Sequence, residues 1–160
     1  MTELELYDFD GQIESGVRNL LAANDLKVFT SFSGEVLADT RIEVIHEAGQ
    51  ALAASHHPTH TQQWSQYEGR LTLIISTPFN QDTTAATLQT QISSKHRELT
   101  AQLRKLLTAY SHDPLANHIP YRITESRPTG TSHHSLGSPD FLYESQLSFA
   151  VRFVVDFTTV

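Results

Sequence analysis

The 160-residue chain contains no cysteine, and this absence removes several kinds of chemistry at once. Disulfide bonds, zinc–thiolate sites and cysteine nucleophiles all need a thiol, and a chain without disulfides fits a reducing compartment. No apolar run approaches the length of about 18 residues that spans a membrane. The acidic start, MTELELYDFD, lacks the apolar core that is typical of a signal peptide. We therefore expect no membrane association.

Basic residues are also scarce. The 11 Lys and Arg residues face 18 Asp and Glu residues, which gives a net charge of -7. Tight phosphate binding needs a surplus of Lys and Arg that displaces counterions. The closest group of basic residues, Lys95, Arg97, Arg104 and Lys105, has the spacing of a solvated helix face. The composition therefore argues against tight binding of nucleic acid.

Motifs for nucleophilic catalysis and nucleotide binding are missing as well. The sequence has no G-x-S-x-G, no Ser-x-x-Lys with its companion motifs, no G-x-G-x-x-G and no P-loop. These absences predict a protein without a nucleophilic active site and without a cofactor.

Hydrophobic periodicity indicates both helices and strands. Spacings of three and four predict helices, and alternation of apolar and polar residues predicts strands. The last element is the clearest, because its odd positions from Tyr143 to Phe157 are mostly apolar and its even positions mostly polar. The predicted helices are residues 9–23 and 86–110, and the predicted strands are KVFTSF, 41–47, 67–77, 121–126 and 143–157.

This order predicts an α+β fold with an antiparallel or mixed β-sheet and helices packed on one face. We expect a single domain over residues 1–160, with long loops at about 50–66 and 127–142. Loops longer than about 12 residues in a compact domain are usually functional or disordered. A last strand of fifteen residues would be about 50 Å long, so we expect it to bend or to extend beyond the sheet.

Three histidines, His56, His57 and His60, lie close together in the segment SHHPTH. A catalytic zinc usually takes three protein ligands and a water, so this trio is a candidate metal site and suggests a metal-dependent hydrolase. Pro58 lies between His57 and His60 and argues against a helix that would place both imidazoles on one face. We favour a polar surface loop, with the metal site as the alternative.

The acidic residues near this segment do not strengthen the metal site. Glu47 and Glu68 are the nearest carboxylates, and each lies at the edge of a predicted strand. The sequence HEAGQ begins like a metalloprotease helix, but Gln50 stands where that motif needs its second histidine. His46 also falls within an alternating strand pattern.

Four further histidines have simpler interpretations. His133 and His134 lie among Gly, Ser and Thr residues, and we expect a solvated loop there. His96 is predicted on a helix surface, and His112 just past a helix end, where the dipole mildly favours imidazolium. The histidines of SHHPTH, His56, His57 and His60, have an unperturbed pKa near 6.5, so they could make assembly sensitive to pH between about 5.5 and 7.

Trp64 and Tyr67 flank the start of the predicted central strand. One interpretation is that both aromatic side chains cap the core at the edge of the sheet. The other is that they anchor a contact between proteins, because Trp and Tyr are enriched at interfaces. Trp64, Tyr67, His133 and His134 are the candidate interface residues.

The order of segments from about residue 9 to residue 157 resembles a class of viral proteins. The segments are IESGVRNLLAAN, RIEV, YEGRLTLIIST, HRELTAQLRKLL, YRITES and YESQLSFAVRFVVDF. Together they are similar to small structural proteins of tailed-phage virions, especially tail terminators and neck proteins of the head–tail junction. The closest local matches are the pair His96 and Arg97 and the aromatic last strand.

The resemblance implies a virion subunit that is assembled in the host cytoplasm. It implies a homo-oligomer, commonly a hexameric ring, at the head-proximal end of the tail, where it stops polymerisation of the tail tube and meets neck or connector proteins. DNA would pass through the acidic lumen without specific binding. A ring needs head-to-tail contacts that close. An adaptor subunit of a bacterial contractile or secretion apparatus is the other non-enzymatic alternative.

Overall fold

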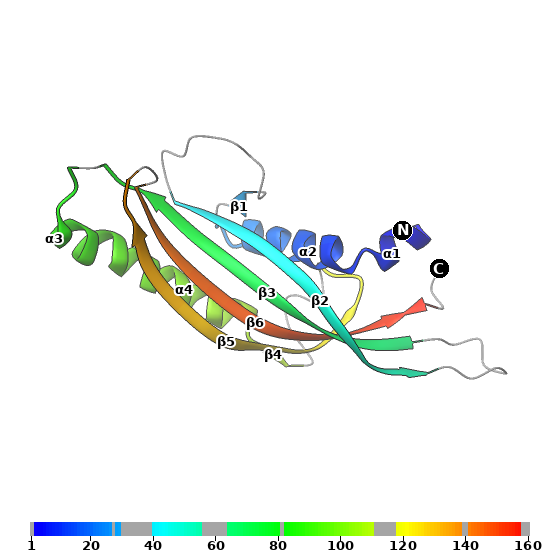
Figure 1. Ribbon diagram of the computed structural model, residues 1–160. Helices are drawn as coiled ribbons and strands as arrows, with labels where there is room; N and C mark the ends of the chain where they lie inside the picture. Colours follow the sequence, from blue (N-terminus) through cyan, green and yellow to red (C-terminus); the bar gives the residue numbers. More distant parts are fainter. Residues whose placement is uncertain are drawn as a thin grey trace.

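The computed structural model describes residues 2–26, 28–29, 40–55, 64–80, 82–110, 118–138 and 141–157. Its main feature is an elongated, curved sheet with four strands of fifteen residues each (Figure 1). These strands are β2 (Arg41–Ser55), β3 (Trp64–Pro78), β5 (Arg122–Leu136) and β6 (Leu142–Asp156). Two-residue strands, β1 (Val28–Phe29) and β4 (Ala109–Tyr110), lie at the two edges.

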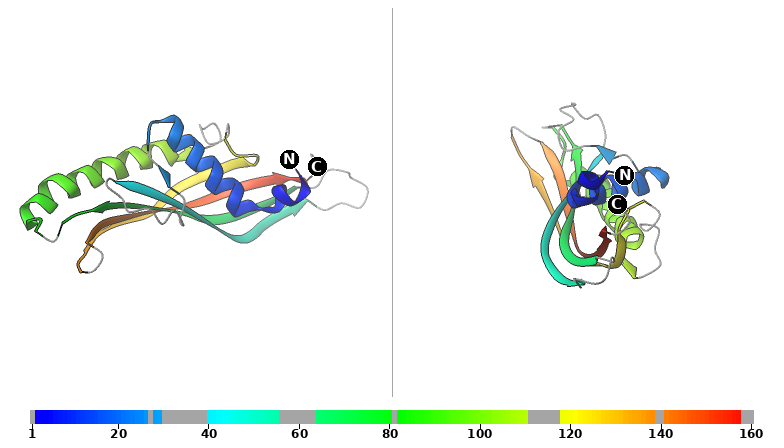
Figure 2. Two further views of the ribbon diagram at one scale, coloured as in Figure 1. Left: turned by 90° about the horizontal axis from the view of Figure 1, so that it is seen from above. Right: turned by 90° about the vertical axis from the view of Figure 1, so that its right-hand side faces the viewer.

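The strand order is β1-β2-β3-β6-β5-β4. β1 runs parallel to β2, and the other neighbouring pairs are antiparallel, so the sheet is mixed. β3 and β6 form the centre and pair along their whole length, from Trp64 opposite Asp156 to Pro78 opposite Leu142. β6 therefore does not extend beyond the sheet, and of the two expected alternatives, a bend or an overhang, the bend is confirmed. The length is accommodated by curvature of the whole sheet (Figure 2).

Helices cover one face of the sheet, as Figures 1 and 2 show. The helical elements are α1 (Glu3–Tyr7), α2 (Phe9–Ala23), α3 (Ala85–Thr87), a π-helical turn at Leu88–Ile92, and α4 (Ser93–Leu107). α2 and α4 pack on the same side, which confirms the predicted α+β class with helices on one face. No helix among the described residues is long and apolar enough to cross a membrane.

The core lies between the two long helices and the covered face of the sheet. Alternation in the strands supplies one half of it, and the apolar stripes of α2 and α4 supply the other. Phe149 and Phe153 of β6 are its largest fully buried side chains. The other core residues of these elements are Ile13, Val17, Leu20, Leu21, Ile42, Val44, Leu71, Leu73, Ile75, Leu103, Leu107, Ile123, Leu147, Val151 and Val155.

The predicted loop at 127–142 is largely wrong, because β5 continues through residue 136. Its composition, RPTGTSHHSL, favours turns, but pairing with β6 from Arg127 opposite Ala150 to Leu136 opposite Leu142 overrides that local preference. A bulge between Pro128 and Gly130 accommodates the proline, which has no N–H to donate. The other predicted loop, at about 50–66, is also partly wrong, because β2 runs to Ser55 and β3 starts at Trp64.

The predicted helix at 86–110 is confirmed from residue 86 to Leu107, although its first part is not regular α-helix. A π-helical turn at residues 88–92 separates α3 from α4, and β4 takes the place of the last predicted helical turn. His96 of α4 is fully buried, so its predicted position on a helix surface is wrong. The short helix α1 was not expected from the sequence, and it begins with a capping box between Thr2 and Glu5.

Gly69 of β3 lies where β2 and β3 pack so closely that a side chain would not fit without a shift. A Cβ atom there would lie 2.9 Å from the carbonyl oxygen of Glu47 and even closer to Nε2 of His46, which is buried. We predict that Gly69→Ala lowers the free energy of unfolding by about 1–3 kcal/mol, as overpacking usually does. Gly130→Ala on β5 is the matched control, because nothing lies within 4 Å of its Cβ position. Urea denaturation of both variants measures the difference, and equal stabilities would contradict the packing.

Candidate interaction surface

The two aromatic residues at the start of β3 have different surroundings. Tyr67 stacks on Phe153 with ring centroids 5.6 Å apart, and its centroid lies 4.6 Å from that of Phe9 on α2. Trp64 pairs with Asp156 in the sheet, and its side chain is 39% exposed. Tyr67 therefore caps the core, whereas Trp64 offers an aromatic surface to solvent.

Trp64 belongs to a group of exposed apolar side chains at one end of the molecule, which we call the apolar end. The exposed large hydrophobic residues of the described chain are Leu4, Tyr7, Leu52 and Trp64. They come from α1 and from the β2–β3 hairpin, which lie at the same end in Figures 1 and 2. Tyr7 is joined to this end by stacking on Phe157, with ring centroids 4.9 Å apart. α1 lies on the covered face, whereas Trp64, three residues from Tyr67 in an uninterrupted strand, points to the uncovered face, so the apolar end includes both faces of the sheet. Exposed apolar side chains of this kind are typical of a binding surface.

The last part of β2 adds an uncharged strand edge to the apolar end. From Ala48 to Ser55 the sequence AGQALAAS carries no charge and no proline, the features that usually protect an edge strand. β1 pairs only with Ile42 and Glu43, so no described strand lies beyond this part of β2. The sequence interpretation missed Leu52 because it placed residues 50–66 in a loop. The uncharged run was the signal that could have identified this edge.

His133 and His134 lie far from the apolar end, on β5 near the opposite hairpin. They are neighbours in a strand, so their side chains point to opposite faces of the sheet. His134 lies on the uncovered face, with Nε2 3.5 Å from the Glu144 carboxylate. His133 lies on the helix side, with Nδ1 2.6 Å from the hydroxyl of Ser145. The structure therefore does not bring the four predicted interface residues together.

His133 is the outer member of a hydrogen-bonded chain that enters the protein. Ser145 Oγ also lies 2.8 Å from Nδ1 of His96, and Nε2 of His96 lies 2.7 Å from Thr77 Oγ1. Thr77 Oγ1 in turn lies 2.6 Å from Thr40 Oγ1. Each hydroxyl in the chain can donate to one neighbour and accept from the other, so one direction of donation satisfies every link. Ser145 is fully buried, which prevents it from acting as a nucleophile on a substrate.

Burial controls the charge of these imidazoles. Burial of His96 lowers its pKa to about 4, with smaller contributions from the nearby charges of His133 and Lys95. Partial burial also lowers the pKa of His133, and the guanidinium groups of Arg97 and Arg104 lower it further. Both side chains are therefore biased toward the neutral form, which leaves one ring nitrogen of each able to accept a hydrogen bond.

A second buried imidazole, His46 of β2, joins the sheet to α2. Its Nδ1–H donates to Oδ1 of Asp10 at 2.8 Å, and the same oxygen accepts the backbone N–H of Ala48 at 2.7 Å. Glu14 accepts the backbone N–H of His46 at 2.9 Å. Burial lowers the pKa of His46, although Asp10 opposes that shift. These contacts are structural, since the ring is only 2% exposed.

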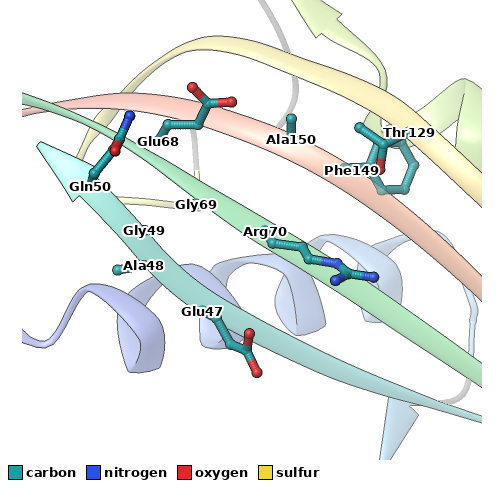
Figure 3. A pocket seen from close by; sticks show the side chains of 10 residues that line it. All are labelled: Glu47, Ala48, Gly49, Gln50, Glu68, Gly69, Arg70, Thr129, Phe149 and Ala150. Carbon is teal, nitrogen blue, oxygen red and sulfur yellow. The ribbon is translucent and has the colours of Figure 1, made fainter. Parts of the chain in front are cut away.

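A wide hollow of about 690 Å³ lies on the uncovered face of the sheet (Figure 3). Its floor consists of residues with little or no side chain, which are Ala48, Gly49, Gly69 and Ala150. Glu47, Glu68 and Arg70 stand around it. The lining contains no histidine, and its only hydroxyl is that of Thr129.

The predicted metal ligands His56, His57 and His60 lie outside the described residues, as does His112. Across the described ranges, no three His, Asp or Glu side chains are grouped so that they could hold a metal ion. The metal site and the pH-sensitive loop histidines of residues 56–60 therefore stay predictions.

No protein-family model and no curated protein matches this sequence. One solved structure that it resembles is a chain from the virion of a native gene transfer agent (GTA) particle. The alignment covers 90% of this chain and 92% of that chain, with a TM-score of 0.45 and 14% sequence identity. A likeness at this level assigns neither a family nor a function to this protein.

The buried His96 predicts how stability depends on pH. The unfolded chain binds a proton on this histidine near pH 6.5, whereas the folded protein does so only near pH 4. Its contribution to folding is therefore complete above about pH 6.5 and is lost as the pH falls toward 4, by about 3 kcal/mol at most. Denaturation at several pH values should show this loss, and His96→Gln should flatten it.

A second measurement uses the wild-type protein and therefore does not depend on whether the His96→Gln variant folds. The His96 ring resonances of the wild-type protein should titrate with a midpoint near 4 in NMR spectra. A midpoint at the ordinary value of 6.5 would contradict the buried, neutral imidazole.

Proposed function

We propose that this protein is a structural subunit of a tailed-phage virion, which forms a ring at the head-proximal end of the tail. In this role it stops polymerisation of the tail tube and joins the tail to neck or connector proteins. The role is one of binding rather than catalysis. The apolar end is the observation that carries the proposal.

The apolar end supports an axial contact with another virion component. Leu4 of α1 is 84% exposed and Trp64 at the start of β3 is 39% exposed. α1 and the start of β3 both lie beyond the part of the sheet that α4 covers (Figure 1). Burying such side chains is worth about 25 cal/mol per Å² of apolar surface, so evolution rarely leaves a group of them in water. The uncharged edge of β2 beside them can accept an added strand from a partner.

The long sheet supports the proposal in a second way. Four strands of fifteen residues carry two hairpins to opposite ends of one rigid body. A subunit of this shape can contact one neighbour with each end while its flanks contact copies of itself. A ring between a tail tube and a connector needs both kinds of contact.

A metal-dependent hydrolase remains the catalytic alternative. It depends on His56, His57 and His60, which lie outside the described residues. The described part of the chain adds no grouped set of metal ligands. A stoichiometric zinc ion in native mass spectra of the untagged protein, purified without chelator, would favour the hydrolase.

An adaptor of a bacterial contractile or secretion apparatus would use the same surfaces. Genome context separates it from the virion subunit. Neighbouring genes for a portal, a tail tube and a tape measure would support the virion role.

Deleting the gene from the phage that encodes the protein tests the function directly. We predict headless tails of uncontrolled length in electron micrographs, because nothing would stop the tube or join it to the head. Particles with normal, attached tails would contradict the proposal. Expression of the wild-type protein from a plasmid should restore intact particles and serves as the control.

The apolar end can be tested by complementing the deletion with a Leu52→Ser/Trp64→Ser variant. We expect it to fold, because both side chains are exposed, and to fail in restoring attached tails. Leu136→Ser at the tip of the other hairpin is the matched control for loss of an apolar side chain. Circular dichroism checks folding. Full restoration by the double variant would show that the apolar end is not a docking surface.

A further inference from the structure

The charged residues of this acidic protein are divided between the two edges of its sheet. The elements at the β2 edge, α1, α2 and β2, carry the acids Glu3, Glu5, Asp10, Glu14, Glu43 and Glu47 against only Arg18 and Arg41. The elements at the β5 edge, α4 and β5, carry the opposite balance. Their basic residues are Lys95, Arg97, Arg104, Lys105, Arg122 and Arg127, against Glu98 and Glu125. The two edges are therefore of opposite sign.

The opposite charges also stand at the same level along the strands. Strand pairing places Glu47 opposite Arg70, Arg70 opposite Ala150, and Ala150 opposite Arg127, so Glu47 and Arg127 mark one row across the sheet. Asp10 and Glu14 of α2 lie at this level on the acidic edge, because they bind the backbone of residues 46 and 48.

Arg104 provides the matching charge on the helix side of the basic edge. Its guanidinium donates to Thr131 Oγ1 at 2.8 Å, which holds it beside β5. Thr131 pairs with Leu147, only a few residues along the strands from the row of Glu47. No carboxylate within the described residues forms an ion pair with Arg104 or Arg97. The side chain of Asp10 on the acidic edge is half exposed, so its charge also reaches solvent.

We propose that the α4/β5 edge of one copy docks against the α2/β2 edge of the next copy, with Arg104 and Arg127 facing Asp10 and Glu47. If successive copies are related by a rotation about an axis parallel to the strands, the charged rows of neighbouring copies stay at the same height. β5 and β2 run in opposite directions within the sheet, so the two strands that meet would be antiparallel, as their neighbours are. This contact specifies how the copies of the proposed ring would meet, and it rests on the proposal that the protein associates with itself.

The charges select a head-to-tail contact over a two-fold one. If the same edge of two copies met, acids would face acids or bases would face bases, and like charges that face one another cost free energy. Edges of opposite sign attract. A pair of copies joined in this way still has one free acidic edge and one free basic edge, to which further copies can bind. Contacts of this kind close into rings or continue as filaments.

A charge swap between edges tests the contact. Arg127→Glu and Glu47→Lys, which reverse the two charges of one row, should each weaken self-association of the full-length protein by about tenfold or more in multi-angle light scattering. Arg70→Glu, in the middle of the uncovered face, is the matched control and should associate like the wild type. A melting temperature for each variant separates lost association from lost folding.

Mixing the two variants gives the decisive result. A 1:1 mixture of Arg127→Glu and Glu47→Lys copies can alternate around a ring so that every contact again joins opposite charges, because these two residues lie in one row and the facing of Arg104 and Asp10 is unchanged. We expect native mass spectra to show assemblies that contain both variants in equal number. Variants that each assemble like the wild type, a mixture that stays dissociated, or a wild-type protein that is monomeric at about 100 μM would each overturn the inference.

The outcomes also distinguish this contact from the proposed function. If gene deletion gives the tail defect but charge reversal leaves assembly unchanged, the function stands and the lateral contact is wrong. If the variants behave as expected but particles without the gene are normal, the contact stands and the function is wrong. DNA binding that Arg127→Glu abolishes, without any change in assembly, would assign the basic edge to a polyanion instead.

Discussion

The edges of the sheet impose the constraint on which the rest of the structure depends. Two outer strands of fifteen residues expose far more main-chain N–H and C=O groups than the two-residue strands β1 and β4 can pair. Asp10 and Glu14 of α2 satisfy part of the β2 edge by accepting the N–H groups of Ala48 and His46. The same carboxylates fix α2 against the sheet. Among the described residues, no strand pairs with the uncharged end of β2 or with most of the outer edge of β5, and those are the places where a partner can be added.

The buried histidines position the helices that carry the charged edges. His96 joins α4 to β3 and β6 through Thr77 and Ser145, and His46 joins α2 to β2 through Asp10. An unpaired polar group in the core would cost about 1–3 kcal/mol, so these hydrogen bonds allow only a narrow range of helix positions. Arg97 and Arg104 project from the helix that His96 holds. A polar network inside the core therefore determines where a charged surface lies outside it.

The parts of the fold that could be predicted from the sequence are those with one buried face. β6 alternates because Phe149 and Phe153 face the helices while Arg152 faces solvent, and this period is visible in the sequence. The second half of β5 could not be predicted, since RPTGTSHHSL is held by strand pairing rather than by burial. His96 was misplaced because its hydrogen-bond partners, Thr77 and Ser145, are distant in sequence. Trp64 was singled out as an interface candidate by its residue type, and that role stays a prediction. Leu52 was not considered because its strand extends past the buried pattern.

The two proposed contacts, between charged edges and at the apolar end, are stabilised by different physical interactions. Charged edges attract over about 8 Å at physiological salt and speed encounter, but exposed ion pairs add little to the lifetime of a contact. Lateral association through Arg104 and Glu47 would therefore be fast and reversible. Apolar burial at Leu52 and Trp64 has no long-range steering, yet it stabilises a contact once the surfaces fit. A subunit with both contacts would associate reversibly with its own copies and would be held more tightly where another component covers the apolar end.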